Sequence, residues 1–276
     1  MTLGILNINK PSGWTSHDVV ARVRRLAAEK RVGHAGTLDP LAEGVLPVLL
    51  GRATRLADYI QAQSKTYVAT VALGTATSTD DAEGSVVATA PVPPFDAQVL
   101  ARFRGDILQV PPAYSALKVD GARAYALARR GAAVTLAPRP VTIYDLRVLS
   151  EGPLTLEVTC SKGTYIRSLA RDIAEALGTV GHLQHLMRSR VGPFSLQTAV
   201  TIEGLDVTES LLPPDAALPD APAIHVNAAD LVRVRNGQPV AAAGLRADVV
   251  RVYDPEGRLV CVAHADGTFA HPRIQL

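Results

Sequence analysis

The sequence predicts a mixed α+β domain over residues 1–211, followed by a linker and a small β-barrel-like domain. Strand-like and helix-like segments interleave before residue 211 without the regular β–α repeat of a doubly wound sheet, which favours the mixed class. Residues 212–223 read L-P-P-D-A-A-L-P-D-A-P-A, a composition typical of a linker. After them, short alternating runs are separated by N-G, D-P-E-G and D-G turns, which predict a β domain over 224–276.

The first expected elements are a strand at residues 5–8 and a helix that begins at Thr15 or Ser16. Pro11 and Gly13 end the strand, and a hydroxyl side chain at the start of the helix serves as its N-cap. The apolar positions of this helix recur at helical spacing and are Val19, Val23 and Leu26.

The later elements follow from alternation, helical spacing and turn residues. Strands are expected at 65–73, 141–149 and 154–160, and a turn at 80–84. Helices are expected at 54–62, at 96–103, from Gly121 to Gly131, and after Gly163, where Gly178 is placed as a C-cap. In the last domain the alternating runs lie near 224–226, 231–234, 248–253 and 258–264.

Composition excludes several classes of protein. The chain has 276 residues, of which 47% are hydrophobic and 20% charged. A chain of this size buries roughly 70% of its extended surface, so it needs no disulfide or metal to fold. Its two cysteines, Cys160 and Cys261, form no C-x-x-C pair, which argues against a zinc ribbon, and Cys160 is interpreted as a packed strand residue.

Nothing in the sequence predicts secretion or a membrane segment. The first residues have no basic region ahead of an apolar stretch, so we expect no signal peptide. The densest apolar run, 45–50, is too short to cross a bilayer. We therefore expect a cytoplasmic protein.

Positive charge is concentrated in one part of the chain. The net charge is +2, yet residues 100–200 carry 13 Lys and Arg against 7 Asp and Glu, while residues 201–276 carry 6 against 10. Such asymmetry is compatible with a positive surface that faces a polyanion, and equally with scattered charge. Of the 28 basic residues 23 are arginine, whose planar fork suits phosphate.

One glycine-flanked segment, 33–46, concentrates the candidate chemistry. It reads G-H-A-G-T-L-D-P-L-A-E-G-V-L and presents the carboxylate of Asp39 and the imidazole of His34. Glycines permit positive φ, and Pro40 favours an extended Asp39, so a short, stiff loop is expected. Taken alone, Asp39-Pro40 is also typical of an ordinary turn, and His34 of a structural histidine.

Three further segments carry groups that suit an anionic ligand. Lys65-Thr66-Tyr67 opens a strand with a cation and a ring on one side, and P-P-A-Y-S-A-L-K ends in Lys118. The segment C-S-K-G-T-Y-I-R, residues 160–167, joins a strand to a helix, and its amides and cations suit an anion. Each also has a structural interpretation: Tyr67 and Tyr165 as core aromatics, and Lys118 as a solvated side chain.

Together these segments resemble the bacterial tRNA pseudouridine-55 synthases of the TruB type. The resemblance runs across nearly all of residues 5–200, and the strings at 33–46 and 160–167 are long and ungapped. It implies a mainly antiparallel core sheet with flanking helices, and a PUA-type RNA-binding module in the tail, where R-N-G-Q-P is the match. Met187 departs from the family pattern, which usually has arginine between Leu186 and Arg188.

The resemblance implies three catalytic residues. Asp39 is the essential carboxylate, which attacks C1′ or C6 or assists elimination at C2′; residue identity does not choose among these routes. Arg167 is the cation that keeps this carboxylate ionised. Tyr67 stacks on the flipped base and is also a candidate for the base that removes the last proton.

The resemblance also implies a set of groups that bind substrate. His34 fills the space that the flipped uridine leaves in the RNA, and Leu186 completes the apolar wall of the pocket. The remaining binding residues are Tyr165, Lys65, Lys118 and Lys162. The implied partner is the T-arm of tRNA, with no membrane, no protein partner and a monomeric chain. Because the reaction is an isomerisation, no cofactor or metal is implied, and His182 and His185 are interpreted as helix or loop histidines.

Two rival functions stay open at this stage. The chain could bind and refold tRNA without catalysis, although the presence of Asp39, Tyr67 and Arg167 argues against a purely passive role. It could also be a hydrolase that uses His34, but it has neither a G-x-S-x-G elbow nor a P-loop.

Overall fold

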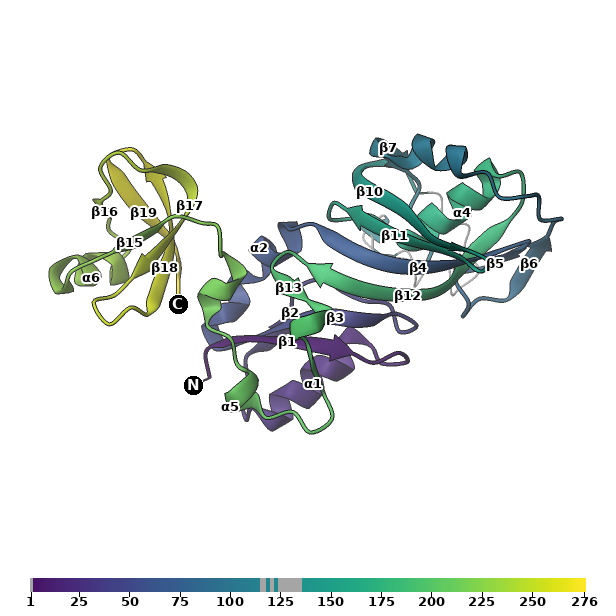
Figure 1. Cartoon of the computed structure of the whole chain (residues 1–276). Coiled ribbons are helices and arrows are strands. Elements are labelled where there is room, and N and C mark those ends of the chain that lie inside the picture. The colour runs from purple at the N-terminus through teal and green to yellow at the C-terminus, as the bar shows by residue number, and fades with distance from the viewer. Residues whose placement is uncertain (1, 115–117, 120–121, 124–135) are drawn as a thin grey trace.

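The computed structural model describes residues 2–114, 118–119, 122–123 and 136–276. Its largest element is a sheet in the strand order β14-β1-β3-β12-β4-β11-β10-β7, with β2 and β13 added at β3 and β12 (Figure 1). Neighbouring strands are antiparallel except β1 with β14 and β3 with β12. The strands are β1 (Gly4–Lys10), β2 (Val32–His34), β3 (Glu43–Leu50), β4 (Lys65–Leu73), β7 (Gly105–Gln109), β10 (Arg139–Glu151), β11 (Leu154–Cys160), β12 (Gly181–Val191), β13 (Phe194–Ser195) and β14 (Val200–Thr201).

Two helices cover different parts of this sheet. α1 (Ser16–Leu26) packs Val19, Val20 and Val23 on β1 and β3. α4 (Ile166–Ala176) packs its apolar stripe on β4, β10, β11 and β12. The remaining pieces of this region are short: α2 (Ala57–Ala62), α5 (Val207–Ser210), the pair β5 (Thr75–Thr77) and β6 (Val86–Thr89), and the pair β8 (Lys118–Val119) and β9 (Ala122–Arg123).

The C-terminal part forms a separate five-stranded sheet, seen at one end of the molecule in Figure 1. Its strand order is β15-β17-β18-β19-β16, with α6 (Ala228–Arg235) beside it. The sheet curls into a half-barrel around its own apolar cluster. The strands are β15 (Ala223–His225), β16 (Val240–Ala241), β17 (Arg246–Tyr253), β18 (Leu259–Asp266) and β19 (Phe269–Gln275).

The two parts share an apolar cluster. Val262 of β18 is buried with Leu56 and Ile60 of the first part and with Leu218 of the connecting segment. Tyr253 donates a hydrogen bond to Asp215 at 2.6 Å. Residues 212–223 are thus packed between the two parts, with a 3₁₀ turn at Pro214–Ala217.

Most of the expected elements are confirmed. The strand at 5–8 lies within β1, and the strands at 65–73 and 154–160 have the predicted bounds. Thr15 caps α1 with a reciprocal capping box to Asp18, and Gly178, just past the C-cap of α4, has φ +82°. Cys160 is a buried strand residue. These signals depend on neighbours in sequence, which is why local pattern was sufficient.

Other expectations were wrong or are changed. The run 231–234 lies in α6, because the Asn227 side chain accepts a hydrogen bond from the Asp230 amide and caps a helix there. The segments 54–62 and 96–103 are helical, but Gly51–Leu56 and Ala97–Phe103 are 3₁₀ rather than α. The expected helix from Gly121 to Gly131 falls mostly outside the described residues, and Ala122–Arg123 within it is a strand.

Removing the N-cap of α1 is expected to destabilise the fold. The Thr15 side chain accepts from the Asp18 amide at 3.1 Å, and the Asp18 carboxylate accepts from the Thr15 amide at 2.8 Å. Thr15→Ala should therefore lower the free energy of unfolding by about 1 kcal/mol in urea titrations. Thr208→Ala, at an exposed threonine in the first turn of α5, is the control. Equal effects of the two substitutions would contradict a special role for this cap.

Candidate active site

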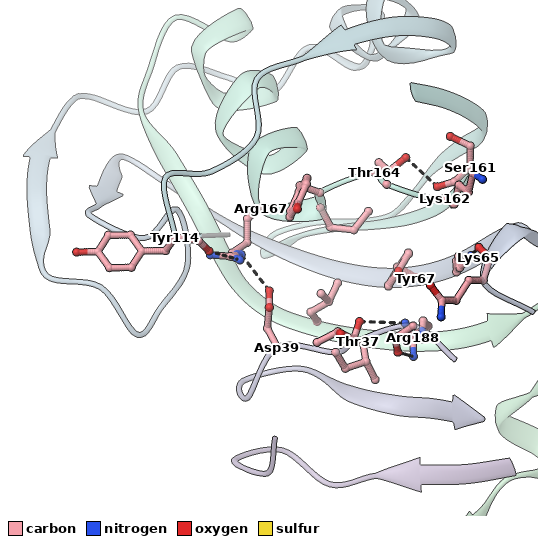
Figure 2. A pocket seen from close by; sticks show the side chains of 17 residues that line it. Thr37, Asp39, Lys65, Tyr67, Tyr114, Ser161, Lys162, Thr164, Arg167 and Arg188 are labelled. Atoms are coloured by element: carbon pink, nitrogen blue, oxygen red, sulfur yellow. Dashed lines mark hydrogen bonds and ion pairs between the residues drawn. The ribbon is translucent and has the colours of Figure 1, made fainter. Parts of the chain in front are cut away.

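A pocket of about 540 Å³ opens between the Asp39 turn, strands β4 and β12 and the start of α4 (Figure 2). A volume of this order suits one nucleoside. Seven of the predicted site residues line it: Asp39, Lys65, Tyr67, Lys162, Tyr165, Arg167 and Leu186. They come from four separate stretches of the chain, which the sheet order brings together.

The central contact of the pocket is an ion pair between Asp39 and Arg167. The Nε of Arg167 lies 3.0 Å from the Oδ2 of Asp39. The side chain of Asp39 is 37% exposed, whereas that of Arg167 is 7% exposed. The carboxylate therefore faces the pocket while its guanidinium partner lies beneath the surface, as Figure 2 shows.

The backbone around Asp39 is held from both sides. The carbonyl of Pro40 accepts from the Gly13 amide at 2.8 Å. Ser16, in the first turn of α1, donates to the carbonyl of Leu38 and accepts from its amide at 2.9 Å. Gly36 has φ +97°, a conformation that a side chain would strain. The loop predicted to be stiff is thus tied to the N-terminal segment, which fixes where the carboxylate points.

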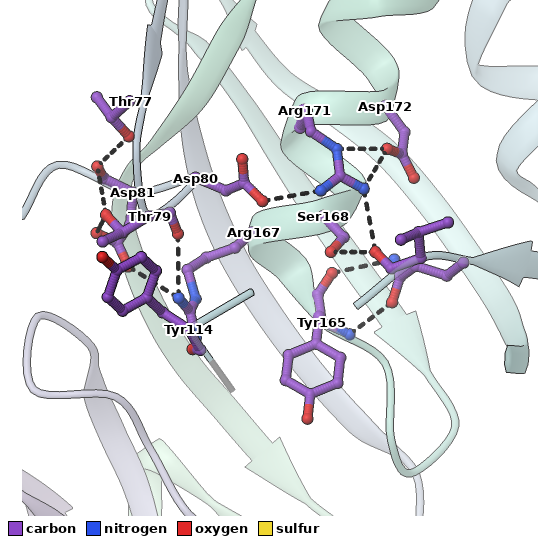
Figure 3. Close-up of polar contacts among 12 residues, drawn as sticks. Thr77, Thr79, Asp80, Asp81, Tyr114, Tyr165, Arg167, Ser168, Arg171 and Asp172 are labelled. Carbon is purple, nitrogen blue, oxygen red and sulfur yellow. Dashed lines mark hydrogen bonds and ion pairs between the residues drawn. The ribbon is translucent and has the colours of Figure 1, made fainter. Parts of the chain in front are cut away.

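Arg167 is held on its far side by a second carboxylate. Its Nη1 lies 3.3 Å from Asp81, whose side chain is 4% exposed, and donates to the carbonyl of Thr79 at 3.1 Å. Its Nη2 donates to the carbonyl of Tyr114 at 3.0 Å (Figure 3). A hydroxyl of Thr79 and the amide of Glu83 donate to Asp81 in turn. The guanidinium cannot rotate away from Asp39 without breaking these contacts.

Tyr67 and Leu186 form neighbouring walls of the pocket. Tyr67 lies on β4 and Leu186 on the adjacent β12, where Leu186 pairs with Ala69. Leu186 is buried in the apolar cluster under α4, and Tyr67 packs against that cluster. Burial raises the pKa of the Tyr67 phenol, with the charge of Arg188 acting in the opposite direction. The ring is therefore a neutral phenol near neutral pH, suited to stacking on a base.

The predicted cations at the pocket differ in their surroundings. The ammonium group of Lys65 is buried and donates to the carbonyls of Gln61 and Gln63 at the end of α2. This burial lowers the pKa of Lys65 to about 8. Lys162 is exposed on the loop before α4, at the pocket. The side chain of Lys118 lies outside the described residues. Its predicted role stays a prediction.

Tyr165 and His34 take different positions relative to the pocket. Tyr165 precedes the first turn of α4 and lines the pocket, with its backbone bonded to the side chain of Gln109 through both amide and carbonyl. His34, on β2, is not among the lining residues and meets His17 edge to face at 5.7 Å between ring centroids. Burial lowers the pKa of His34, with the charges of His17 and Arg188 adding to the effect.

The structure corrects the interpretation of two histidines and places Met187. His182 and His185 lie on strand β12, not in a helix or loop. A bulge between Leu183 and His185 breaks the alternation that would have identified the strand. No group of three potential metal ligands occurs among the described residues. Met187 alternates with the pocket-lining Leu186 and Arg188, so its side chain points to the other face of the sheet.

Sequence reasoning missed three buried charged residues around the pocket: Asp81, Lys10 and Arg188. The ammonium group of Lys10 donates to the carbonyls of Pro11, Trp14 and Pro40, and burial lowers its pKa to about 8. Lys10 ends a strand that also contains Asn7 and Asn9, and Arg188 lies in a strand rich in other polar residues, so the local sequence did not mark either as buried.

Comparisons with known proteins agree with this architecture. Three family models match: TruB family pseudouridylate synthase (N terminal domain) over 24–166, tRNA pseudouridylate synthase B C-terminal domain over 167–216, and Pseudouridine synthase II TruB, C-terminal, over 222–270. The tRNA pseudouridine synthase B of Thermobifida fusca is 45% identical over 278 residues, covering 95% of this chain and 94% of that one.

Solved structures show the same fold. A Cbf5-Nop10-Gar1 complex contains a chain that matches with a TM-score of 0.74 and 28% identity, over 99% of this chain and 84% of that one. An H/ACA RNP bound to a substrate RNA containing 2′-deoxyuridine matches with a TM-score of 0.74 and 27% identity, over the same shares of the two chains.

The core sheet, its pocket and the curled C-terminal half-barrel together define a pseudouridine synthase. Within that class the chain belongs to the TruB family, and it is a tRNA pseudouridine synthase, an isomerase that acts on uridine in tRNA. Over the described residues, no helix is both long enough and apolar enough to cross a membrane.

Asp81 is expected to influence the reaction although it lies behind Arg167. Asp81→Asn removes the negative charge that holds the Arg167 guanidinium on the side away from Asp39. Hydrogen bonds to charged groups contribute roughly 1.5–3 kcal/mol each to stability. The single-turnover rate of pseudouridine formation should fall roughly tenfold or more. Asp80→Asn is the matched control, because the neighbouring Asp80 pairs with Arg171 instead. A rate equal to that of the control would contradict the ordering of Arg167 by Asp81.

Proposed function

We propose that the chain converts uridine to pseudouridine at position 55, in the T-loop of tRNA, by flipping the base into the pocket beside Asp39. The observation that carries this proposal is the Asp39–Arg167 ion pair in the wall of a pocket of nucleoside size. The alternative is a protein that binds and refolds tRNA without changing it.

The reaction breaks the N-glycosidic bond, turns the uracil and joins its C5 to C1′ of the ribose. No atoms are gained or lost, because the proton that leaves C5 is replaced by one at N1. Each route open to Asp39, attack at C1′ or C6 or assisted elimination at C2′, requires a carboxylate that is ionised and exposed towards the nucleoside. Pairing with Arg167 and the 37% exposure of its side chain suit Asp39 to that task.

Base flipping is required for the target uridine of a folded RNA to reach the pocket. A stacked uridine cannot enter the pocket, so it must leave its stack at a cost of a few kcal/mol. The ring of Tyr67 offers a stacking surface worth roughly 1–3 kcal/mol per base, and Leu186 closes the neighbouring wall. His34 lies outside the pocket on β2, and its proposed role is to occupy the space that the uridine vacates in the loop.

The rest of the chain is proposed to hold the RNA. In this division residues 1–211 form the catalytic domain, 212–223 the linker and 224–276 a PUA-like RNA-binding domain. The shared apolar cluster that includes Val262 would keep the two domains in a constant relation while tRNA is bound. The chain is proposed to act in the cytoplasm as a monomer without a cofactor. RNA as the ligand is supported by a similar solved protein that is bound to a substrate RNA.

Tritium release from tRNA tests catalysis against simple binding. Unmodified tRNA with tritium at uracil C5 should lose the label at position 55, and a tRNA with cytidine at 55 should retain it. Asp39→Asn should lower the single-turnover rate more than about a thousandfold, since it removes the reacting group. Its Kd for tRNA should stay within about threefold, because phosphate contacts dominate binding.

Asp58→Asn, at an exposed carboxylate on α2, is the control and should retain the wild-type rate. Tritium release by Asp39→Asn at the control rate would contradict the role of this carboxylate. Binding of tRNA by the wild-type chain without any release would support the refolding alternative.

A further inference from the structure

We propose that Arg188 is a positioning residue for the reaction: its guanidinium joins the two arms of the Asp39 turn and so fixes the carboxylate against Arg167. The inference rests on the proposed role of Asp39. It concerns a residue on β12 that lies under the pocket and that the catalytic scheme above does not use.

The contacts of Arg188 span the turn from one arm to the other. Its Nη2 donates to the carbonyl of Gly36 at 3.0 Å and its Nη1 to that of Thr37 at 3.3 Å, both on the arm before Asp39. Its Nε donates to the carbonyl of Val45 at 2.8 Å, on the arm after Asp39. A guanidinium presents its donors in a rigid plane, so these three bonds fix the distance between the arms.

Sheet register explains why Arg188 can reach both the turn and the pocket wall. On one side of β12, Arg188 pairs with Tyr67 of β4, and on the other side it pairs with Gly44 of β3. Gly44 has φ +104°, and a Cβ there would lie 2.3 Å from the carbonyl oxygen of Arg188. The two strands therefore approach too closely for any side chain at position 44, so the backbone of Arg188 lies directly beside the arm that follows Asp39.

The burial and charge of Arg188 indicate that this arginine has a specific role and does not merely fill space in the core. Arg188 is 1% exposed, and in the described part of the chain its hydrogen-bond partners are three carbonyl oxygens and the Tyr67 phenol rather than a carboxylate. A buried cation without an anionic partner is costly, and an apolar residue would fill a core position more cheaply. Burial is the main cause of the lowered pKa values of Lys10, Lys65 and His34, and the positive charge of Arg188 adds to the effect in each case.

Arg188→Lys separates positioning from charge. Lysine keeps the positive charge, but a single ammonium group cannot bridge three carbonyls on two arms of the turn. A misplacement of the carboxylate by about 1 Å costs a reaction roughly 100-fold, so the single-turnover rate at saturating tRNA should fall by about that factor. The Kd for tRNA should change by less than about threefold, because a residue this buried makes no phosphate contact.

The matched control is Arg190→Lys. Arg190 is an exposed arginine on the same strand, bonded to the carbonyl of Gly192, and its substitution should leave rate and Kd unchanged. Rates are normalised to the folded fraction measured by urea titration, since a purely structural role would lower stability without lowering the rate per folded molecule. A wild-type single-turnover rate in Arg188→Lys would overturn the proposal. So would weaker tRNA binding with an unchanged rate at saturating tRNA.

Gly44→Ala disturbs the packing of β3 against Arg188 from the β3 side. It provides a second test if the Arg188→Lys protein does not fold. The added Cβ forces β3 away from the backbone of Arg188 without removing any charge. A large rate loss with tRNA binding retained is expected, and an unchanged rate would contradict the proposal. Activity of the wild-type chain is measured alongside. If that activity is absent, the proposed function fails, whereas a wild-type rate in the variants defeats only the role of Arg188.

Discussion

The site depends on a buried guanidinium held between two carboxylates. Arg167 faces Asp39 at 3.0 Å on the pocket side and Asp81 at 3.3 Å on the buried side. Removing a guanidinium from water is costly unless its charge and donors are satisfied, and here backbone carbonyls of Thr79 and Tyr114 complete the set. The Asp39 carboxylate is thereby held against a fixed positive charge at the pocket, which suits it to the proposed isomerisation.

The fold serves this ion pair by bringing distant segments to one place. Strand β12 runs between β3 and β4, so the Asp39 turn that precedes β3 and the Tyr67 strand lie on either side of it. α4, which carries Arg167, packs across β4 and β12. In the proposal made for Arg188, this second buried arginine, on β12, fixes the conformation of the Asp39 turn. Arg167 supplies the positive charge that pairs with the Asp39 carboxylate.

Sequence reasoning identified the residues that present chemistry to the pocket and missed those that support them. Asp39 and Arg167 were found because they lie in long strings shared with a known family, and Tyr67 and Leu186 because shorter segments resemble the same family. Asp81 and Arg188 carry no local signal of burial, since each is buried only once strands far apart in sequence have paired. Strand β12 was missed for a related reason, because its bulge disrupts the period of two.

The central claim is tested most directly by a crystal structure of the Asp39→Asn protein with a T-arm stem-loop that carries 5-fluorouridine at position 55. The account predicts a nucleoside turned out of the loop, its base against Tyr67 and Leu186, and its ribose in contact with residue 39. Electron density that shows this uridine still stacked in the RNA, or a pocket closed to it while the RNA is bound elsewhere, would contradict the account.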